Sequence, residues 1–353
     1  MKHLYIVDII GSHCGMHYYD NALSDLLKNK FKVKILSTYS LNNLNQGFFP
    51  NIFNHNKFIL FILLFMCWIR FLIFRFTHKG IYIYLCYGEL YDLPFLITAF
   101  MGNVYIDIHE VHALKYKDKS FVAKLLKFFI RTFTKQVVYH SSRTELILKE
   151  IDYKGRKIYV PHFKYNFKKN YNEINISSEI RHVYKSNHYK FLFFGNLSKV
   201  KGIDVVLDSF LKNNNLNNIE LVIAGKNVEN IDFKNIKQLN DHIKIVPRHI
   251  NDDELVYLYS HTDYVLLPYR KSSQSGILAM ATYFKKPMIL SDIPYFKNII
   301  EQYPSFGICG DLNIYQNLIN QIIEIPYNKF YQLSDCEKYE QKTEFDKFIS
   351  EIY

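Results

Sequence analysis

Residues 190–210, KFLFFGNLSKVKGIDVVLDSF, join an apolar run to a Gly-Asn-Leu-Ser turn and then to a Lys-Gly pair that opens an amphipathic segment. The pattern predicts a strand, a glycine turn and a helix. A helix N-terminus presents unpaired N–H groups and a positive dipole end, and Lys199 and Lys201 add full charges. We therefore expect an anion site, most plausibly for phosphate. The alternative is an ordinary surface turn with solvated lysines.

A second stretch, residues 266–292, reads LLPYRKSSQSGILAMATYFKKPMILSD. It predicts a strand, a polar loop, a helix opened by Gly276, a tight turn and another strand. The backbone N–H groups of Ser275, Gly276 and Ile277 would begin that helix and form a second anion-binding end. We expect this end and Lys201 to converge on one ligand.

Together the two stretches resemble the glycosyltransferases of the GT-B fold, closest to family 4 (group 1). In that family, the lysine at the Lys201 position and a basic residue after the glycine contact the diphosphate of a nucleotide sugar. Arg248 lies where the family holds the nucleotide base, although it is equally typical of a loop cation. The resemblance implies this set of donor-binding residues: Gly11, Gly15, Asn196, Lys199, Lys201, Arg248, Gln274, Ser275, Gly276 and Ile277.

The sequence also departs from the family pattern. Asn196 stands in place of the usual arginine, and Ser273 and Ala281 stand where the family has two glutamates, one near the sugar and one on the ribose. Gln274 or Ser275 would then make the sugar contact. The missing glutamates leave a second interpretation open, a non-catalytic GT-B scaffold that binds a nucleotide sugar or a partner transferase.

The candidate catalytic residues follow an apolar strand at 104–108. In the family, a histidine at the end of the corresponding strand touches the donor sugar, and the Ile-His-Glu sequence that holds His109 and Glu110 is similar. Imidazole can donate to a sugar hydroxyl or transfer a proton near neutral pH, and Glu110 could orient it or act as a base. The alternative is a structural histidine.

Strand-like runs and helix-length segments alternate along the whole chain, which predicts an α/β fold with parallel sheets. The resemblance implies GT-B: two doubly wound Rossmann-like domains that face a central cleft, with a C-terminal helix that crosses back to the first. We expect an acceptor- and membrane-facing domain at 1–165, a linker at 166–188, a nucleotide-sugar domain at 189–326 and a cross-over tail at 327–353. The expected strands are 4–9, 33–36, 81–86, 104–108, 137–140, 158–161, 191–194, 220–224, 243–246, 264–267, 288–290 and 306–309.

The net charge of +11 is confined to the first half of the chain. Residues 1–165 hold 22 of the 44 Lys and Arg but 11 of the 33 Asp and Glu, so the second half is balanced at 22 against 22. A basic first half favours an anionic partner there, such as a phospholipid surface or a lipid pyrophosphate. The five cysteines show no metal or disulfide spacing, which favours a reducing cytoplasm.

Residues 58–74, FILFILLFMCWIRFLIF, are the most apolar part of the chain. The run is slightly short for a spanning helix, and Arg70 interrupts it. We expect a helix that lies at the membrane surface and presents Trp68, Phe71 and Phe74 to anionic lipid, with Arg70 and Arg75 beside them. The rival interpretation is a buried crossover helix.

These expectations combine into one function. We expect a metal-independent glycosyltransferase of hexosyltransferase type that passes sugar from a UDP- or GDP-linked donor to a hydroxyl of a lipid-linked glycan in surface polysaccharide biosynthesis. No Asp-x-Asp element is present to hold a cation, and we expect no cofactor beyond the co-substrate. The protein would lie in the cytoplasm, peripherally on the inner face of the cell membrane. A sugar-nucleotide epimerase is disfavoured, because the basic, aromatic first domain would have no role in it. Nucleic-acid binding is disfavoured, because the basic residues interleave with long apolar runs.

Overall fold

The chain forms two units, Met1–Phe163 and Lys164–Lys342, which are described one at a time. The computed structural model describes residues 1–11, 16–39, 47–53, 55–109, 120–160, 170–184, 188–212, 218–233, 242–272 and 275–342.

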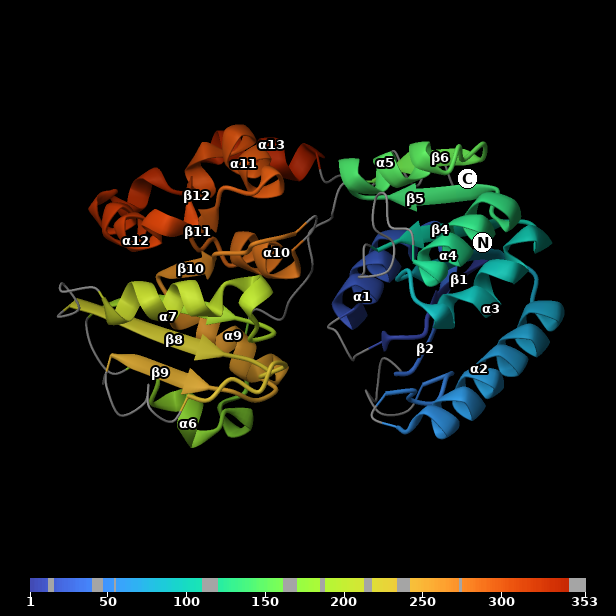
Figure 1. Cartoon of the computed structure of the whole chain (residues 1–353), viewed down its shortest axis with the longest axis horizontal. Coiled ribbons are helices and arrows are strands. Elements are labelled where there is room, and N and C mark those ends of the chain that lie inside the picture. Colours follow the sequence, from blue (N-terminus) through green and yellow to red (C-terminus); the bar gives the residue numbers. More distant parts are fainter. Residues whose placement is uncertain are drawn as a thin grey trace. The chain divides into compact units, whose positions relative to one another are not determined.

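The first unit is built on a six-stranded parallel sheet of order β2-β1-β3-β4-β5-β6 (Figure 1). Its central strands, such as IYIYLC at 81–86, are continuous apolar runs, as expected for parallel strands that are covered on both faces. They are β1 (Lys2–Asp8), β2 (Phe31–Ser37), β3 (Ile81–Cys86), β4 (Val104–Ile108), β5 (Gln136–Tyr139) and β6 (Arg156–Tyr159).

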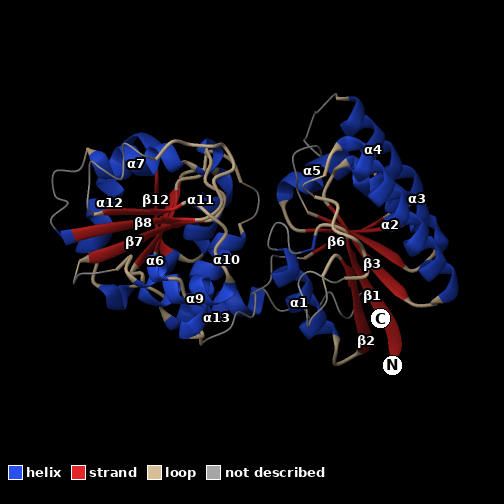
Figure 2. Ribbon diagram, turned by 90° about the horizontal axis from the view of Figure 1, so that it is seen from below, coloured by secondary structure: helices blue, strands red, loops and turns tan. Residues whose placement is uncertain are grey.

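Helices cover both faces of this sheet, with α1 on one face and α2, α3 and α4 on the other (Figure 2). A salt bridge of 2.9 Å from Lys127 to Glu150 joins α4 to α5. The helices are α1 (Met16–Leu27), α2 (Lys57–Thr77), α3 (Leu93–Ile97), α4 (Phe121–Phe133) and α5 (Ser142–Glu150), with short 3₁₀ turns η2 (Leu90–Asp92) and η3 (Thr98–Met101) beside α3.

The second unit repeats the plan with a parallel sheet of order β12-β11-β10-β7-β8-β9. The order reverses at the β7–β10 boundary, and such switch points are where α/β sheets bind ligands. The strands are β7 (Tyr189–Phe194), β8 (Ile219–Ala224), β9 (Ile243–Val246), β10 (Tyr264–Leu267), β11 (Met288–Ser291) and β12 (Gly307–Gly310).

Helices α7 and α12 pack on one face of the second sheet and α9 and α10 on the other (Figure 2). The core on the α7 side joins Phe191 of β7, Phe210 of α7 and Ile319 of α12, each fully buried. The elements are η4 (Glu173–Asn175), α6 (Ser178–Arg181), η5 (Lys199–Lys201), α7 (Ile203–Leu211), α9 (Asp252–His261), α10 (Gly276–Tyr283), α11 (Pro294–Gln302), η7 (Pro304–Phe306), η8 (Leu312–Ile314), α12 (Tyr315–Glu324), η9 (Tyr327–Lys329) and α13 (Leu333–Lys342).

All twelve strands predicted from the sequence are present, with ends that shift by at most a few residues. The segment expected to be a featureless linker differs, because it contains η4 and α6, which are hydrogen-bonded to α9. Residues 327–342 also pack within the second unit: the Tyr339 ring lies 5.1 Å from that of Tyr303. Residues 343–353, which would complete the predicted cross-over, lie outside the described residues.

Helix α2 presents a different face from the one predicted. Phe71 and Phe74 are buried on the first sheet, where Phe71 contacts Tyr84 at a ring distance of 5.4 Å. Arg75 is also buried and donates to the carbonyls of Met101 and Gly102 at 3.0 and 2.9 Å. These three residues are therefore not available to lipid. The exposed apolar residues of α2 are instead Phe58, Ile59, Phe61, Ile62, Phe65, Met66, Ile69, Ile73 and Phe76.

Candidate functional site

The Lys-Gly turn of the second unit is the 3₁₀ turn η5, held by its own backbone. Ser198 caps it and accepts from the N–H of Lys201 at 3.4 Å. Gly202 follows with φ of +78°, and a Cβ there would lie 2.0 Å from the carbonyl oxygen of Pro268. Only glycine fits both the left-handed backbone and the close approach to the end of β10.

Arg270, in the loop after β10, stabilises this turn through an ion pair and hydrogen bonds. Its guanidinium pairs in bidentate fashion with Asp204 of α7 at 2.7 and 2.8 Å, and also donates to the carbonyl of Lys199. Its backbone N–H donates to the carbonyl of Val200 at 2.9 Å. A bidentate Arg–carboxylate pair fixes geometry more tightly than a single ion pair. The position of η5 is therefore set by a loop some 70 residues further along the chain.

The ammonium group of Lys201 lies over the ring of Tyr269, 3.7 Å from the ring centroid. This is a close cation–π contact, and Tyr269 is 99% buried, so the ring forms a fixed platform. Among the described residues, the Lys201 ammonium has no hydrogen-bond acceptor. Its N–H groups are thus free for an anionic ligand.

The start of α10 lies close to the glycine turn that follows β7. Ser275 is buried and caps α10 by accepting from the N–H of Leu278 at 3.2 Å. A Cβ built on Gly195 would lie 3.4 Å from Cδ1 of Ile277, so the turn and the helix start touch. The first N–H groups of a helix have no intrahelical acceptor. The second unit thus places Gly195, which precedes the exposed Asn196, beside the N-terminus of α10. Lys199 and Lys201 lie in η5 of the same unit. Gln274 and Ser273 lie outside the described residues.

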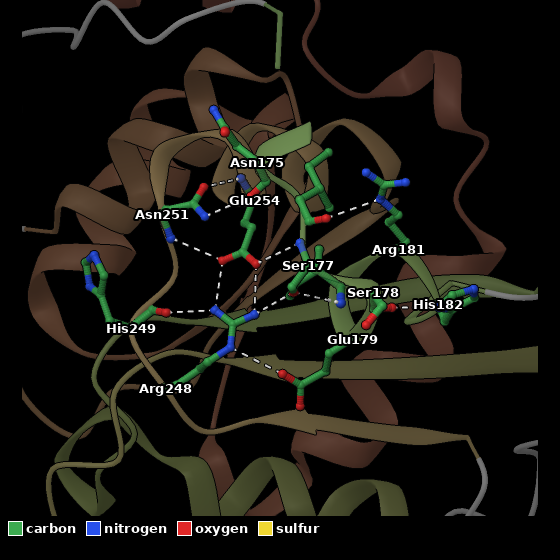
Figure 3. A network of polar contacts seen from close by, with 12 residues as sticks. Asn175, Ser177, Ser178, Glu179, Arg181, His182, Arg248, His249, Asn251 and Glu254 are labelled. Atoms are coloured by element: carbon green, nitrogen blue, oxygen red, sulfur yellow. Dashed lines mark hydrogen bonds and ion pairs between the residues drawn. The ribbon is translucent and has the colours of Figure 1, made fainter. Parts of the chain in front are cut away.

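The guanidinium of Arg248, the candidate base-pocket residue, is hydrogen-bonded within the second unit. All five of its N–H donors are used: two on Glu254 at 2.8 Å each, and one each on Glu179 at 3.2 Å, Ser177 at 2.7 Å and the His249 carbonyl at 2.9 Å (Figure 3). Arg248 therefore joins α6 to α9. It borders a cavity of about 440 Å³ together with Asn251 and Ile174, but no N–H remains for a base.

In the first unit, His109 lies in a buried polar cluster at the carboxyl ends of β4 and β5. Oδ1 of Asp107 lies 2.6 Å from Nε2 of His140 and 3.5 Å from Nε2 of His109. The hydroxyl of Tyr19 donates to Oδ2 of Asp107 at 2.5 Å. The predicted catalytic partner Glu110 lies outside the described residues.

The two members of the closest pair stabilise each other's charge. Burial alone would raise the pKa of Asp107, but the neighbouring His140 and His109 hold that pKa well below its usual range. Burial lowers the pKa of His140, while the charge and hydrogen bond of Asp107 outweigh burial and raise it. Asp107 and His140 could not be identified from the sequence, because a single buried acid or histidine carries no signal until the sheet pairs β4 with β5.

The start of the predicted glycine loop after β1 is hydrogen-bonded to the end of that strand. Asp8 accepts from the N–H of Ile10 at 2.9 Å, from that of Gly11 at 2.7 Å and from the hydroxyl of Tyr87 at 2.6 Å. Gly11 has φ of +60°, and a Cβ would lie 2.2 Å from Oγ1 of Thr38. Its N–H is thus already used, which leaves it unavailable to a donor phosphate. Gly15 lies outside the described residues.

The family match lies in the second unit. Residues 177–343, which hold η5, Tyr269 and α10, match the family model described as glycosyl transferases group 1. The second unit therefore resembles the group 1 glycosyltransferases over most of its length. Placement in family 4 within this group stays a prediction. No curated protein sequence matches the chain.

Solved structures show the fold of the whole chain. Sucrose-phosphate synthase from Thermosynechococcus elongatus is 14% identical, with a TM-score of 0.72, over 100% of this chain and 97% of that one. HepE from Anabaena, solved in complex with UDP-glucose, is 13% identical, with a TM-score of 0.68, over 100% and 98%. WaaG, a glycosyltransferase involved in lipopolysaccharide biosynthesis, is 12% identical, with a TM-score of 0.60, over 96% and 94%. The chain therefore has the GT-B fold along its length.

Proposed function

We propose that this chain is a glycosyltransferase that takes a nucleotide diphosphate sugar, UDP- or GDP-linked, and transfers its hexosyl group to a hydroxyl of a lipid-linked glycan in surface polysaccharide biosynthesis. One observation carries the proposal: the Lys201 ammonium is held on Tyr269 without a hydrogen-bond acceptor among the described residues, in the same unit as the N-terminus of α10. That combination suits a diphosphate. The UDP-glucose complex of HepE supports the choice of donor.

In this proposal the departing diphosphate is stabilised by the chain itself. Lys201, Lys199 and the N-terminal N–H groups of α10 supply positive potential where negative charge develops. No metal ion is needed on the diphosphate, and no further cofactor takes part. His109 and Glu110 act on the sugar, His109 as a hydrogen-bond donor or proton carrier.

We further propose that the first unit binds the cytoplasmic face of an anionic membrane through α2. This helix is long and apolar enough to cross a membrane, yet only 17% of its most apolar 18-residue stretch is buried in the protein. Its C-terminal half packs on the sheet through Phe71, Phe74 and Arg75, which opposes spanning. The outward residues, from Phe58 to Phe76, suit insertion at the lipid interface, and the exposed Lys57 and Arg70 suit anionic headgroups.

A second candidate function, a non-catalytic scaffold, is favoured by one observation. Ala281 is fully buried in α10, so no carboxylate occupies the ribose position of the family. Such a protein would bind nucleotide sugar but transfer nothing.

A thermal-shift screen tests the donor proposal. UDP-sugars and GDP-sugars, with free UDP and GDP as controls, are added to the purified chain, since a ligand that binds the native state at 100 times its Kd stabilises it by about 2.7 kcal/mol. We expect one nucleotide class to raise the melting temperature. No shift with either class would contradict the proposal. A shift without sugar transfer to any membrane glycan extract would establish the scaffold instead.

A further inference from the structure

We propose that Asp107, His109 and His140 form a binding site for one Zn²⁺ ion in the first unit. Their ligand atoms all lie within 4.8 Å of one another. The three residues are at least 94% buried, with exposed fractions of 1%, 5% and 6%. Two imidazoles and one carboxylate are a donor set that Zn²⁺ binds with a fourth position left over.

The sheet explains why these residues meet. Asp107 and His109 are two positions apart at the end of β4, so their side chains project from the same face. β4 pairs with β5 in a register that sets Asp107 beside Val138 and Ile108 beside Tyr139. His140, the next residue after β5, therefore lies beside His109.

The hydrogen-bond roles of His140 leave its Nε2 suited to a cation. Nδ1 lies 2.8 Å from the carbonyl oxygen of Val160, which can only accept, so Nδ1 carries the hydrogen. In a neutral ring Nε2 then has a lone pair, and it lies 2.6 Å from a carboxylate oxygen. Two such acceptors approach this closely only when a proton or a metal ion lies between them.

The outer contacts are those that orient metal ligands. A ligating histidine typically donates its other ring N–H to a carbonyl or carboxylate, as His140 does to Val160. A ligating carboxylate typically accepts a second hydrogen bond, as Asp107 does from Tyr19. These outer hydrogen bonds thus hold Nε2 of His140 and Oδ1 of Asp107 facing each other.

The surroundings of His109 favour a metal ion over a proton between His140 and Asp107. Nε2 of His109 is buried and lies 3.5 Å from Oδ1 of Asp107, but this contact lacks hydrogen-bond geometry, so the nitrogen has no hydrogen-bond partner among the described residues. A shared proton would satisfy His140 and Asp107 but leave this nitrogen unsatisfied, at a cost of roughly 1–3 kcal/mol. A single Zn²⁺ ion would use all three atoms. Ligands of tetrahedral Zn²⁺ lie about 3.3 Å apart, which is close to the 3.5 Å distance from Nε2 of His109 to Oδ1 of Asp107. On metal binding the 2.6 Å distance from His140 to Asp107 would widen by about 0.7 Å, and the two imidazoles, whose ligand atoms lie within 4.8 Å of each other, would adjust to the same spacing.

The site rests on its own geometry rather than on the proposed transfer reaction, but it changes two expectations. One is that of a chain without metal, and the other is the role of His109, whose Nε2 would hold the ion and could not carry a proton while it does. The expectation of a chain without metal rested on the lack of an Asp-x-Asp element, whereas the trio is assembled by strand pairing.

Metal titration of the full, untagged chain tests the proposal. After treatment with EDTA and its removal, Co²⁺ is titrated while visible absorption is recorded, and Zn²⁺ is then added as a competitor. We expect one equivalent of Co²⁺ with absorption typical of four-coordinate Co²⁺, displaced by one equivalent of Zn²⁺.

Three variants locate the site. His109→Gln removes one ligand without breaking a hydrogen bond to any described residue, so it is expected to fold, as circular dichroism can verify. It and Asp107→Asn should weaken metal binding by more than about tenfold, whereas the exposed His182→Gln should bind as the wild type does. Absence of stoichiometric binding by the wild type, or undiminished affinity of folded His109→Gln, would overturn the proposal.

Discussion

Lys201 is positioned by an aromatic ring rather than by a counter-charge. A carboxylate partner would neutralise the ammonium and compete with a diphosphate, whereas a ring face attracts the cation and leaves its N–H groups free. The hydroxyl of Tyr269 is buried and has no hydrogen-bond partner among the described residues. The ring of Tyr269, rather than its hydroxyl, therefore positions Lys201.

Two substitutions of Tyr269 separate the role of its ring from that of its hydroxyl. A cation–π contact of this kind is worth about 0.5–2 kcal/mol, so Tyr269→Leu should raise the KM for the nucleotide sugar about fivefold. Tyr269→Phe keeps the ring and should keep the wild-type KM. Steady-state kinetics with varied donor measure both, and an equal rise in the two variants would contradict a role for the ring.

Whether a residue of the site could be predicted depends on how far along the chain its partners lie. Lys199, Lys201 and Ser275 could be predicted from the sequence because their local turns and helix start are encoded by neighbouring residues. Arg270 could not, since its partner Asp204 is 66 positions away. The contacts of Arg248 could not be predicted for the same reason, because its partners Glu179 and Ser177 are about 70 positions away.

At the scale of elements, the Arg248 network attaches η4 and α6 to α9. Asp253 accepts from the N–H of Asn172 at 3.0 Å and from the amide of Asn175 at 2.7 Å. Glu254 accepts from Arg248 and, at 3.3 Å, from the N–H of Ser177. Burial alone would raise the pKa of Glu254, but these hydrogen bonds lower the pKa to about 2.

This lowered pKa makes the stability of the second unit depend on pH. The ionised form of Glu254 is favoured in the folded state, so its contribution is complete above the unfolded pKa of about 4.5. It is lost as the pH falls from about 5 towards 2. Urea unfolding at pH 7, 5 and 3 should show this loss in the wild type and a smaller loss in Glu254→Gln. The more exposed Glu179→Gln serves as the control and should keep the wild-type slope, whereas equal slopes in all three proteins would refute the assignment.

Helix α2 carries the proposed membrane contact through its exposed N-terminal half. Burying a phenylalanine is worth about 1.5–3 kcal/mol, so Phe58→Ser combined with Phe61→Ser should weaken binding to anionic vesicles at least tenfold. Both side chains are about 70% exposed, so the fold should be unaffected. Leu333→Ser, an equally exposed change in α13, is the control. Co-sedimentation measures binding, and unchanged binding of the double variant would exclude α2 as the anchor.

At the scale of the whole molecule, the strands of both sheets could be predicted because buried parallel strands are continuous apolar runs between polar or glycine turns. The run of Ile81 to Cys86, for example, is buried at every position. The packing of 170–184 could not be predicted, since its polar sequence shows no periodicity and its order comes from α9. The exposed face of α2 was also misassigned, because a helix that is apolar all round does not indicate which side meets the sheet.

The central claim is that a nucleotide diphosphate sugar is bound and turned over at the Lys201 turn. The most direct measurement compares sugar transfer by Lys201→Ala with that of the wild type, with the exposed, salt-bridged Lys212→Ala as a matched control. Loss of a preorganised cation at a developing charge costs about 10²–10³ in rate. We predict at least a hundredfold loss of transfer for Lys201→Ala at an unchanged melting temperature, and a wild-type rate for Lys212→Ala. Transfer by Lys201→Ala at the wild-type rate would contradict the account.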